Sequence, residues 1–167
     1  MVMNEKERMN DNDKKIFNVV KPKLLKINDV QNLNFKDKDS YYGLGWSHNQ
    51  GKPGIWSEGP ISTLLFRIDN TYGDLKLEIS CRPYITKKNS ILEFDIYVNN
   101  SLNKNMKLTN KNQDETFEIL IKEKLIENNE IKIDFNFKNP VSPYEVLESP
   151  DSRKLGILVK NIIMSPI

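Results

Sequence analysis

The sequence predicts an all-β protein, an antiparallel β-sandwich of jelly-roll-like form with about eight strands and one or two short helical turns. Apolar and polar residues alternate with a period of two along most of the chain, which is typical of strands with one buried face. A solvated second face favours antiparallel sheets. Segments of helical periodicity are scarce, and many short strands with few helices favour a sandwich. A length of 167 residues suits one domain.

Residues 1–20 are highly charged and poor in aromatic residues, so we expect a flexible N-terminal arm. A frayed helix and a linker are the alternatives that this composition leaves open. The single β-sandwich domain is then expected to span residues 21–167.

Three segments show the alternation most clearly. In the first, Leu75, Leu77, Ile79 and Cys81 share one face. The other two are residues 92–98 and 131–137, and shorter strands are expected at 23–28, 62–68, 102–108 and 115–121. The strand that begins at Leu155 is apolar on both faces at its start, which indicates a central position. Helical turns are expected only at 122–128 and 142–147.

Residues 43–60 contain both tryptophans and the only histidine among glycines, prolines and polar residues. This composition predicts a loop whose tryptophans either pack back onto the core or present a platform. Trp46 lies among glycines and polar residues, so it is the better candidate for a platform. Trp56 directly precedes an apolar run, so it is expected in the core.

Composition argues against several classes of function. The 25 Lys and Arg residues nearly balance 23 Asp and Glu residues, which argues against a nucleic-acid binder with a uniform basic field. A single cysteine and the single His48 leave no disulfide, no Cys-based zinc site and no multi-histidine centre, so no metal or cofactor is expected. No apolar segment approaches the ~20 residues of a membrane span, and a cytoplasmic location is expected.

The chain also lacks the local motifs of nucleophilic, phosphate-binding and dinucleotide-binding enzymes, and we expect a non-enzyme. An acid-pair hydrolase or esterase remains an alternative, because two carboxylates that meet in space leave no local pattern. The acids nearest the tryptophan segment and the closing loop are Glu58, Glu145, Glu148 and Asp151. Residues 69–74 offer a weak calcium-loop pattern that a plain turn explains equally well.

Three islands of sequence occur in order: "YYGLGWS…GIWSEGPISTLLFRI", "LEFDIYVNN" and "FKNPVSPYEVLESPDSRKLGILVKNIIM". Together they resemble a β-sandwich accessory module associated with bacterial glycosyltransferases that build surface polysaccharides. The most specific part is the closing "SPDSRKLGI". Two positions depart from the pattern: the spacer after Trp46 lacks a Glu, and "VNG" is replaced by "VNN".

The resemblance implies a non-catalytic, carbohydrate-binding-like module that serves cell-surface glycan assembly. An aromatic plane can receive the C–H face of a sugar while polar side chains bind its hydroxyls. The candidate ligand-binding residues are Trp46, Trp56, Tyr42, Tyr144, Asp151 and Arg153. The structural alternative is that Asp151, Arg153, Trp56 and Ser57 lock the loops together. A protein-interaction domain that docks on a glycosyltransferase is the alternative function, and its partner would be that enzyme instead of a carbohydrate.

Overall fold

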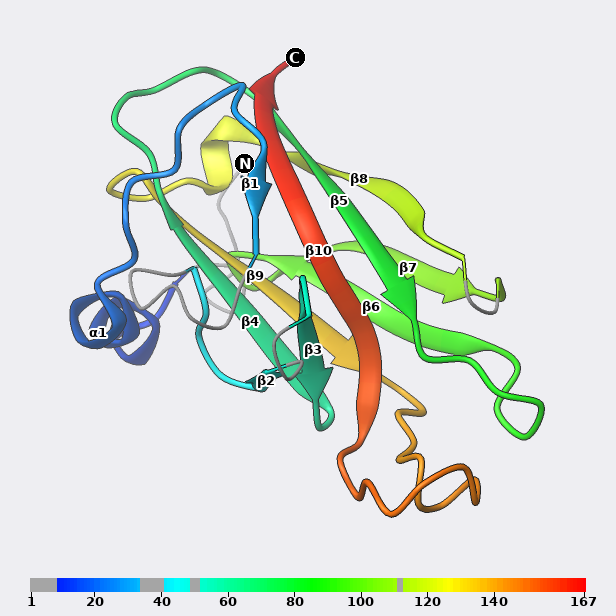
Figure 1. Cartoon of the computed structure of the whole chain (residues 1–167). Coiled ribbons are helices and arrows are strands. Elements are labelled where there is room, and N and C mark those ends of the chain that lie inside the picture. The colour runs from blue at the N-terminus through cyan, green and yellow to red at the C-terminus, as the bar shows by residue number, and fades with distance from the viewer. Residues whose placement is uncertain (1–8, 34–40, 49–51, 111–112) are drawn as a thin grey trace.

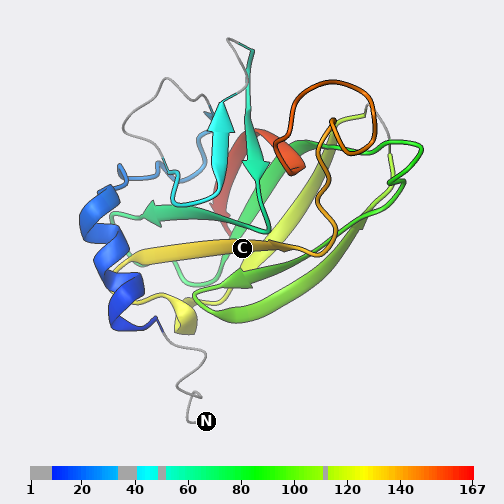
Figure 2. The same ribbon diagram turned by 90° about the horizontal axis from the view of Figure 1, so that it is seen from below.

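The computed structural model describes residues 9–33, 41–48, 52–110 and 113–167, which form two antiparallel sheets packed face to face (Figures 1 and 2). This arrangement confirms the predicted all-β sandwich. Burial alternates along most strands, so each sheet has one apolar face turned toward the other sheet and one face turned toward solvent.

The six-stranded sheet has the order β2, β3, β10, β5, β8, with β1 also paired to β10. Its strands are β1 (Gln31–Asn32), β2 (Trp46–His48), β3 (Ile55–Glu58), β5 (Leu75–Pro83), β8 (Glu115–Ile121) and β10 (Leu155–Pro166). The four-stranded sheet has the order β4, β9, β6, β7. Its strands are β4 (Ile61–Arg67), β6 (Leu92–Val98), β7 (Ser101–Leu108) and β9 (Glu130–Phe137).

The core lies between the two sheets and uses the faces that the sequence predicts. On β5 the residues from Leu75 to Cys81 alternate between buried and half-buried, with the predicted apolar face inward. Phe94 of β6 is fully buried, and its ring lies 5.1 Å from Phe137 and 6.2 Å from Phe135 of β9. These ring contacts hold β6 and β9 together at the centre of the sandwich.

Strand β10 occupies the predicted central position. It pairs with β5 along one side, and along its other side with β3 and then β1. Leu158 points to the outer face of the sheet and is nevertheless 7% exposed, which explains the apolar character of both faces. The β6–β7 hairpin turns at Asn99 and Asn100, whose φ values of 45° and 71° fit the turn geometry that asparagine tolerates.

Within the segment expected to be a flexible arm, residues 11–20 form a helix, α1 (Asp11–Val20), which was one of the open alternatives, and residues 1–8 lie outside the described residues. The helix lies beside one end of β4 and β9 (Figure 2). The helix begins with a capping box in which the Asn10 side chain accepts from Asp13 N and the Asp13 carboxylate accepts from Asn10 N. Phe17 is fully buried and packs with Leu65 on the outer face of β4. Met9 is buried in the same cluster, and Ile16 and Val20 pack against it, so a small apolar cluster binds this charged helix to the sheet.

Three shorter expectations also differ. The predicted tryptophan loop contains an antiparallel pair, β2 and β3. Residues 23–28 form no strand and make one isolated bridge, between Leu24 and Arg67. Residues 142–147 turn without completing a helix, since Leu147 has a φ of 62°, whereas the expected turn near 122–128 is present as the 3-10 helix η2 (Glu123–Leu125).

In the part of the chain that the structure describes, no helix has the length and apolar character needed to cross a membrane.

Candidate functional site

Three side chains form a row across the outer face of the four-stranded sheet. Tyr97 of β6 pairs in register with Asp134 of β9, and Asp134 pairs with Thr63 of β4. Side chains directly opposite each other on neighbouring strands lie about 5 Å apart at their Cβ atoms. The Thr63 hydroxyl donates to Asp134 Oδ1 over 2.6 Å. The row therefore combines an aromatic ring, a carboxylate and a hydroxyl on one surface.

A second row of side chains lies beside the first, toward the C-terminal end of β9. It contains Asn136 of β9 and, opposite it, Ile61 of β4 and Asp95 of β6. Ile61 is 51% exposed, so this end of the sheet surface is open to solvent. Apolar and polar groups are therefore adjacent on the open side.

Helix α1 closes the opposite side of this surface. Its underside is fixed by Phe17, whose backbone carbonyl accepts a hydrogen bond of 3.1 Å from Arg67 Nη2. The Arg67 guanidinium also lies 6.0 Å from the Phe17 ring centroid, within cation–π range. These contacts place the first turn of the helix, with Asn10 and Asp13, above β9.

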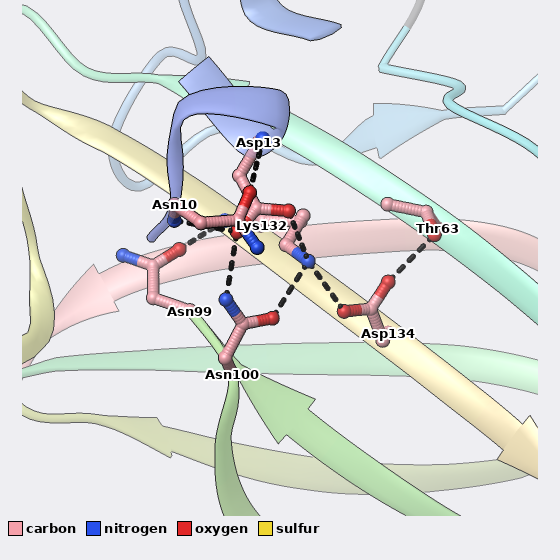
Figure 3. Close-up of polar contacts among 7 residues, drawn as sticks. All are labelled: Asn10, Asp13, Thr63, Asn99, Asn100, Lys132 and Asp134. Carbon is pink, nitrogen blue, oxygen red and sulfur yellow. Dashed lines mark hydrogen bonds and ion pairs between the residues drawn. The ribbon is translucent and has the colours of Figure 1, made fainter. Parts of the chain in front are cut away.

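Lys132 links the helix, the sheet and the β6–β7 turn (Figure 3). Its Nζ lies 3.0 Å from Asp13 Oδ1 and 2.9 Å from Asp134 Oδ2, and it donates to Asn100 Oδ1 over 2.8 Å. The Lys132 side chain is 10% exposed. Burial alone would lower the pKa of Lys132, but the Asp134 and Asp13 carboxylates outweigh it and raise that pKa.

The β6–β7 turn holds Lys132 from the other side. The Asn99 side chain accepts from Lys132 N over 2.6 Å and donates to the carbonyls of Leu125 and Glu130. Asn100 Nδ2 donates to Asp13 Oδ2 over 2.7 Å. The asparagine that replaces glycine in "VNN" thus joins the turn to α1.

The space between α1 and the sheet is a cavity of about 660 Å³, which we call the α1 cavity. Its lining combines the Tyr97 ring, three aliphatic side chains, four neutral amides, one hydroxyl and three charged groups. The residues are Asn10, Asn12, Asp13, Ile16, Leu44, Ile61, Thr63, Tyr97, Asn100, Lys132, Asp134 and Asn136. Its size is that of a small-ligand site.

Trp46 and Tyr42, two of the sequence-predicted ligand residues, pack against the core instead of forming an exposed platform. Trp46 Nε1 donates to Thr63 O over 2.8 Å, and its ring lies edge-on to Phe135 at 6.2 Å. The Tyr42 ring lies 6.2 Å from that of Trp46. The Trp46 indole thus supports the backbone of β4 from the side opposite the α1 cavity.

Trp56 has the reverse orientation from the one expected. Its neighbours Ile55 and Ser57 are buried, so strand alternation turns Trp56 to the outer face of the six-stranded sheet, where it is half-buried. Its ring lies edge-on to Tyr84 at 6.1 Å. Trp56 is therefore on the other sheet from the α1 cavity.

Asp151 and Arg153 form a local lock in the loop before β10. The Asp151 carboxylate accepts from Arg153 N over 3.0 Å and from Arg153 Nη2 over 2.7 Å. Arg153 Nη1 donates to Ser47 Oγ on β2 over 3.0 Å. The guanidinium holds the pKa of Asp151 below its ordinary value, and Asp151 raises that of Arg153. Tyr144, in the same loop, is 63% exposed and its backbone N–H donates to Asp151 O.

Ser57 of β3 and Gly156 of β10 add further contacts next to the Asp151–Arg153 pair. Ser57 Oγ is buried and accepts from Ile157 N over 2.9 Å. A Cβ at Gly156 would lie 2.6 Å from a Phe137 ring carbon and 2.7 Å from Ser57 Oγ. The "SPDSRKLGI" motif thus makes structural contacts between β2, β3, β9 and β10. Ligand binding by the six sequence-predicted residues stays a prediction.

Three of the four acids considered for hydrolysis already have partners. Asp151 pairs with Arg153, Glu145 pairs with Lys154, and Glu148 accepts from Tyr84 OH over 2.9 Å. Burial is the largest cause that raises the pKa of Tyr84, and Glu148 adds to it. The fourth, Glu58, is exposed at the end of β3. The side chain of His48 lies outside the described residues.

The aspartates of the weak calcium-loop pattern, residues 69–74, accept hydrogen bonds from the protein itself. The Asp69 carboxylate accepts from Tyr72 OH, and Asp74 accepts from Glu123 N over 2.9 Å at the start of η2. Among the residues that the structure describes, no group of three or more His, Cys, Asp and Glu side chains could hold a metal ion. These aspartates instead fix two turns.

No protein-family model matches the chain, and no curated protein matches its sequence. Several solved structures are similar in fold. Dimeric latent PorU from Porphyromonas gingivalis has a TM-score of 0.48 at 12% identity over 80% of this chain, which spans 12% of the PorU chain. The CBM36-1 domain of a xylanase from the hindgut metagenome of Trinervitermes trinervoides has a TM-score of 0.47 at 7% identity, covering 83% of this chain and 98% of that domain.

A xylan-binding module, CBM15, has a TM-score of 0.47 at 11% identity, covering 82% of this chain and 95% of that module. At such low identities and TM-scores, these similarities assign no ligand to this chain.

The residues of the α1 cavity were not singled out by the sequence. The sequence did predict the two strands that carry Tyr97, Lys132 and Asp134, and its alternation turns these side chains to the outer face. That alternation was the only sign of them in the sequence. Their meeting depends on the pairing of β6 with β9 and on the position of α1. Neither follows from local sequence pattern.

Proposed function

We propose that the protein is a non-catalytic carbohydrate-binding module and that its binding surface is the α1 cavity. The observation that carries this proposal is the composition of the cavity lining. One aromatic ring and exposed aliphatic groups stand beside amides, a hydroxyl and carboxylates within about 660 Å³.

This combination matches the two-sided chemistry of a sugar. The C–H face of a pyranose ring packs on an aromatic or aliphatic surface, which Tyr97, Leu44 and Ile61 supply. Its hydroxyls need donors and acceptors arranged around that surface. The side-chain amides of Asn136 and Asn12 each offer an NH₂ donor and a carbonyl acceptor. Binding requires no charged nucleophile or base.

The test is titration of the full chain with soluble polysaccharides, followed by calorimetry, for wild type and two variants. Tyr97→Ala is expected to weaken binding about two- to tenfold, since stacking of one ring on an aromatic side chain is worth on the order of 0.5–1.5 kcal/mol. Tyr144→Ala removes an exposed tyrosine from a loop outside the α1 cavity and is expected to leave affinity unchanged. A loss of binding in this variant would place the site at the closing loop that the sequence predicts.

Trp56→Ala tests which sheet carries the carbohydrate site, independently of whether the protein binds carbohydrate. Loss of binding in Trp56→Ala with normal binding in Tyr97→Ala would move the site to the six-stranded sheet while keeping carbohydrate binding. Absence of binding to every glycan by the folded wild-type chain would contradict the function itself.

We further propose that the module works beside a glycosyltransferase in the assembly of bacterial surface glycans, in the cytoplasm. The support is the ordered resemblance of the three sequence islands to modules associated with such enzymes. Affinity purification of the tagged chain from its own cells tests this point. We expect to recover a glycosyltransferase in stoichiometric amount. If the chain recovers this enzyme but binds no glycan, the alternative function is favoured, a protein-interaction domain that docks on the glycosyltransferase.

A further inference from the structure

We propose that the ligand of the α1 cavity is a neutral or amino-bearing glycan and that the cavity rejects uronic and sulfated glycans. This inference rests on the proposed function and specifies its class of ligand. It follows from how the charged groups of the cavity are already used.

The only cation among the described lining residues has no donor left for a ligand. An ammonium group has three N–H donors. Those of Lys132 are directed at Asp13 Oδ1, Asp134 Oδ2 and Asn100 Oδ1, at 2.8 to 3.0 Å. An acidic sugar would have to break one of these contacts to reach the charge.

The carboxylates, by contrast, keep acceptor capacity. A carboxylate has about four lone-pair positions. Within the described part of the chain, Asp134 accepts from the Thr63 hydroxyl and from Lys132. Its side chain is 15% exposed and lines the cavity. Hydroxyl or ammonium donors of a ligand can therefore bind Asp134 without displacing its partners.

The formal charge of the lining points the same way. Among the described lining residues, two aspartates, Asp13 and Asp134, stand against one lysine, which leaves a formal charge of −1. A carboxylate or sulfate brought into this space meets like charge in a partly buried setting, where screening by water is reduced. An amino sugar meets opposite charge.

One feature of the site acts in the opposite sense. The N-terminus of α1 borders the cavity, and a helix N-terminus favours anions. Here the first turn already carries Asp11 and Asp13, and the Asp13 carboxylate accepts from Asn10 N over 2.9 Å. The protein's own carboxylate thus takes the position that a bound anion would use.

The experiment is a glycan array that presents neutral, 2-amino, uronic and sulfated sugars in shared linkages, probed with the full chain. Neutral or amino glycans are expected to bind at least about tenfold more tightly than their uronic counterparts. Equal or tighter binding of the uronic forms would overturn the inference and leave carbohydrate binding intact. No binding to any glycan would contradict the proposed function, and the inference with it.

A change of charge within the cavity gives an independent readout. Asn136→Lys adds a cation on β9, opposite Asp95, and changes the formal charge of the described lining residues from −1 to 0. It is expected to shift the uronic-to-neutral affinity ratio upward by about tenfold. Asn161→Lys adds the same charge on β10 of the other sheet and is expected to leave the ratio unchanged. An unchanged ratio in a folded Asn136→Lys protein would contradict the assignment.

Discussion

The Asp13 carboxylate lies 3.0 Å from Lys132 Nζ, and this contact joins helix α1 to the middle of the four-stranded sheet. Asp134 meets the same ammonium from the sheet itself. The wall of the α1 cavity is therefore held by a charge cluster as well as by the apolar contact of Phe17 with Leu65.

Removal of the shared cation is expected to be costly. Lys132→Met leaves two carboxylates facing each other with little water, and breaking such a pair costs about 3 kcal/mol of unfolding free energy. Urea denaturation measures this change. The control is Lys138→Met, which removes a half-exposed partner of Asp95 and is expected to cost less than about 1 kcal/mol. Equal effects of the two variants would show that the cluster contributes no special stability.

Stability is expected to fall in acid through Asp13. Burial opposes ionisation of this carboxylate, but hydrogen bonds from Asn10 and Asn100 and the charge of Lys132 hold its pKa below the ordinary 3.8. Because the pKa of Asp13 is lower in the folded state, its carboxylate stabilises the fold fully at pH values above the ordinary pKa of 3.8. This contribution declines as the pH falls below 3.8, and it is lost once Asp13 is protonated in the folded state as well.

Melting temperatures measured across this acidic interval test the assignment. Asp13→Asn is expected to flatten the acid limb of the wild-type profile, since this variant has no carboxyl group to protonate. Asp11→Asn, which removes a neighbouring carboxylate from the same helical turn, serves as the control. A wild-type slope in Asp13→Asn would assign the acid sensitivity to another group.

Gly156 is expected to tolerate no side chain. Its Cβ would lie 2.6 Å from the Phe137 ring and 2.7 Å from Ser57 Oγ, so Gly156→Ala should lower the unfolding free energy by about 1–3 kcal/mol. Chemical denaturation provides the measurement. Gly73→Asn is the matched control, because that position is open and its φ of 74° is one that asparagine adopts. A neutral Gly156→Ala would mean that Phe137 moves aside freely.

Arg153 distinguishes a structural lock from a ligand contact. Arg153→Lys keeps the charge but loses the fork that reaches both Asp151 and Ser47, so we expect a loss of about 1 kcal/mol in stability. Glycan affinity is expected to stay unchanged. Weakened binding at unchanged stability would return Arg153 to the ligand site that its sequence motif predicts.

Cys81 is expected to be inert in the folded protein. Its side chain is fully buried on the inner face of β5, and burial raises the pKa of its thiol to about 12, with smaller contributions from Glu115 and Asp114. A chromogenic disulfide reagent should therefore react only after denaturant is added. Rapid reaction of the native protein would show that β5 opens readily.

The sequence was a good guide to elements and faces. The alternation in β5, β6 and β9 places the predicted residues inward, because period two reflects the geometry of a strand directly. The Asn99–Asn100 turn also fits its sequence, since asparagine is one of the few residues other than glycine that adopt its backbone angles.

The sequence was a poor guide to the tryptophans and to the cavity. Glycine and proline in residues 43–60 indicated a loop, and without the bounds of β2 and β3 the faces of Trp46 and Trp56 were assigned the wrong way round. The charges of residues 1–20 concealed a helix that Phe17 holds. The α1 cavity depends on contacts between Asp13, Asn100 and Lys132, which are distant in sequence and leave no local pattern.

The central position of β10 determines when the six-stranded sheet can be completed. This strand lies between β5 and the pair β3 and β1, yet it follows every other strand along the chain. During synthesis, residues 155–166 must be made before these earlier strands can pair with their shared neighbour. Such distant pairing slows folding, so the edges of β5, β3 and β1 that face β10 stay unpaired until residues 155–166 are available.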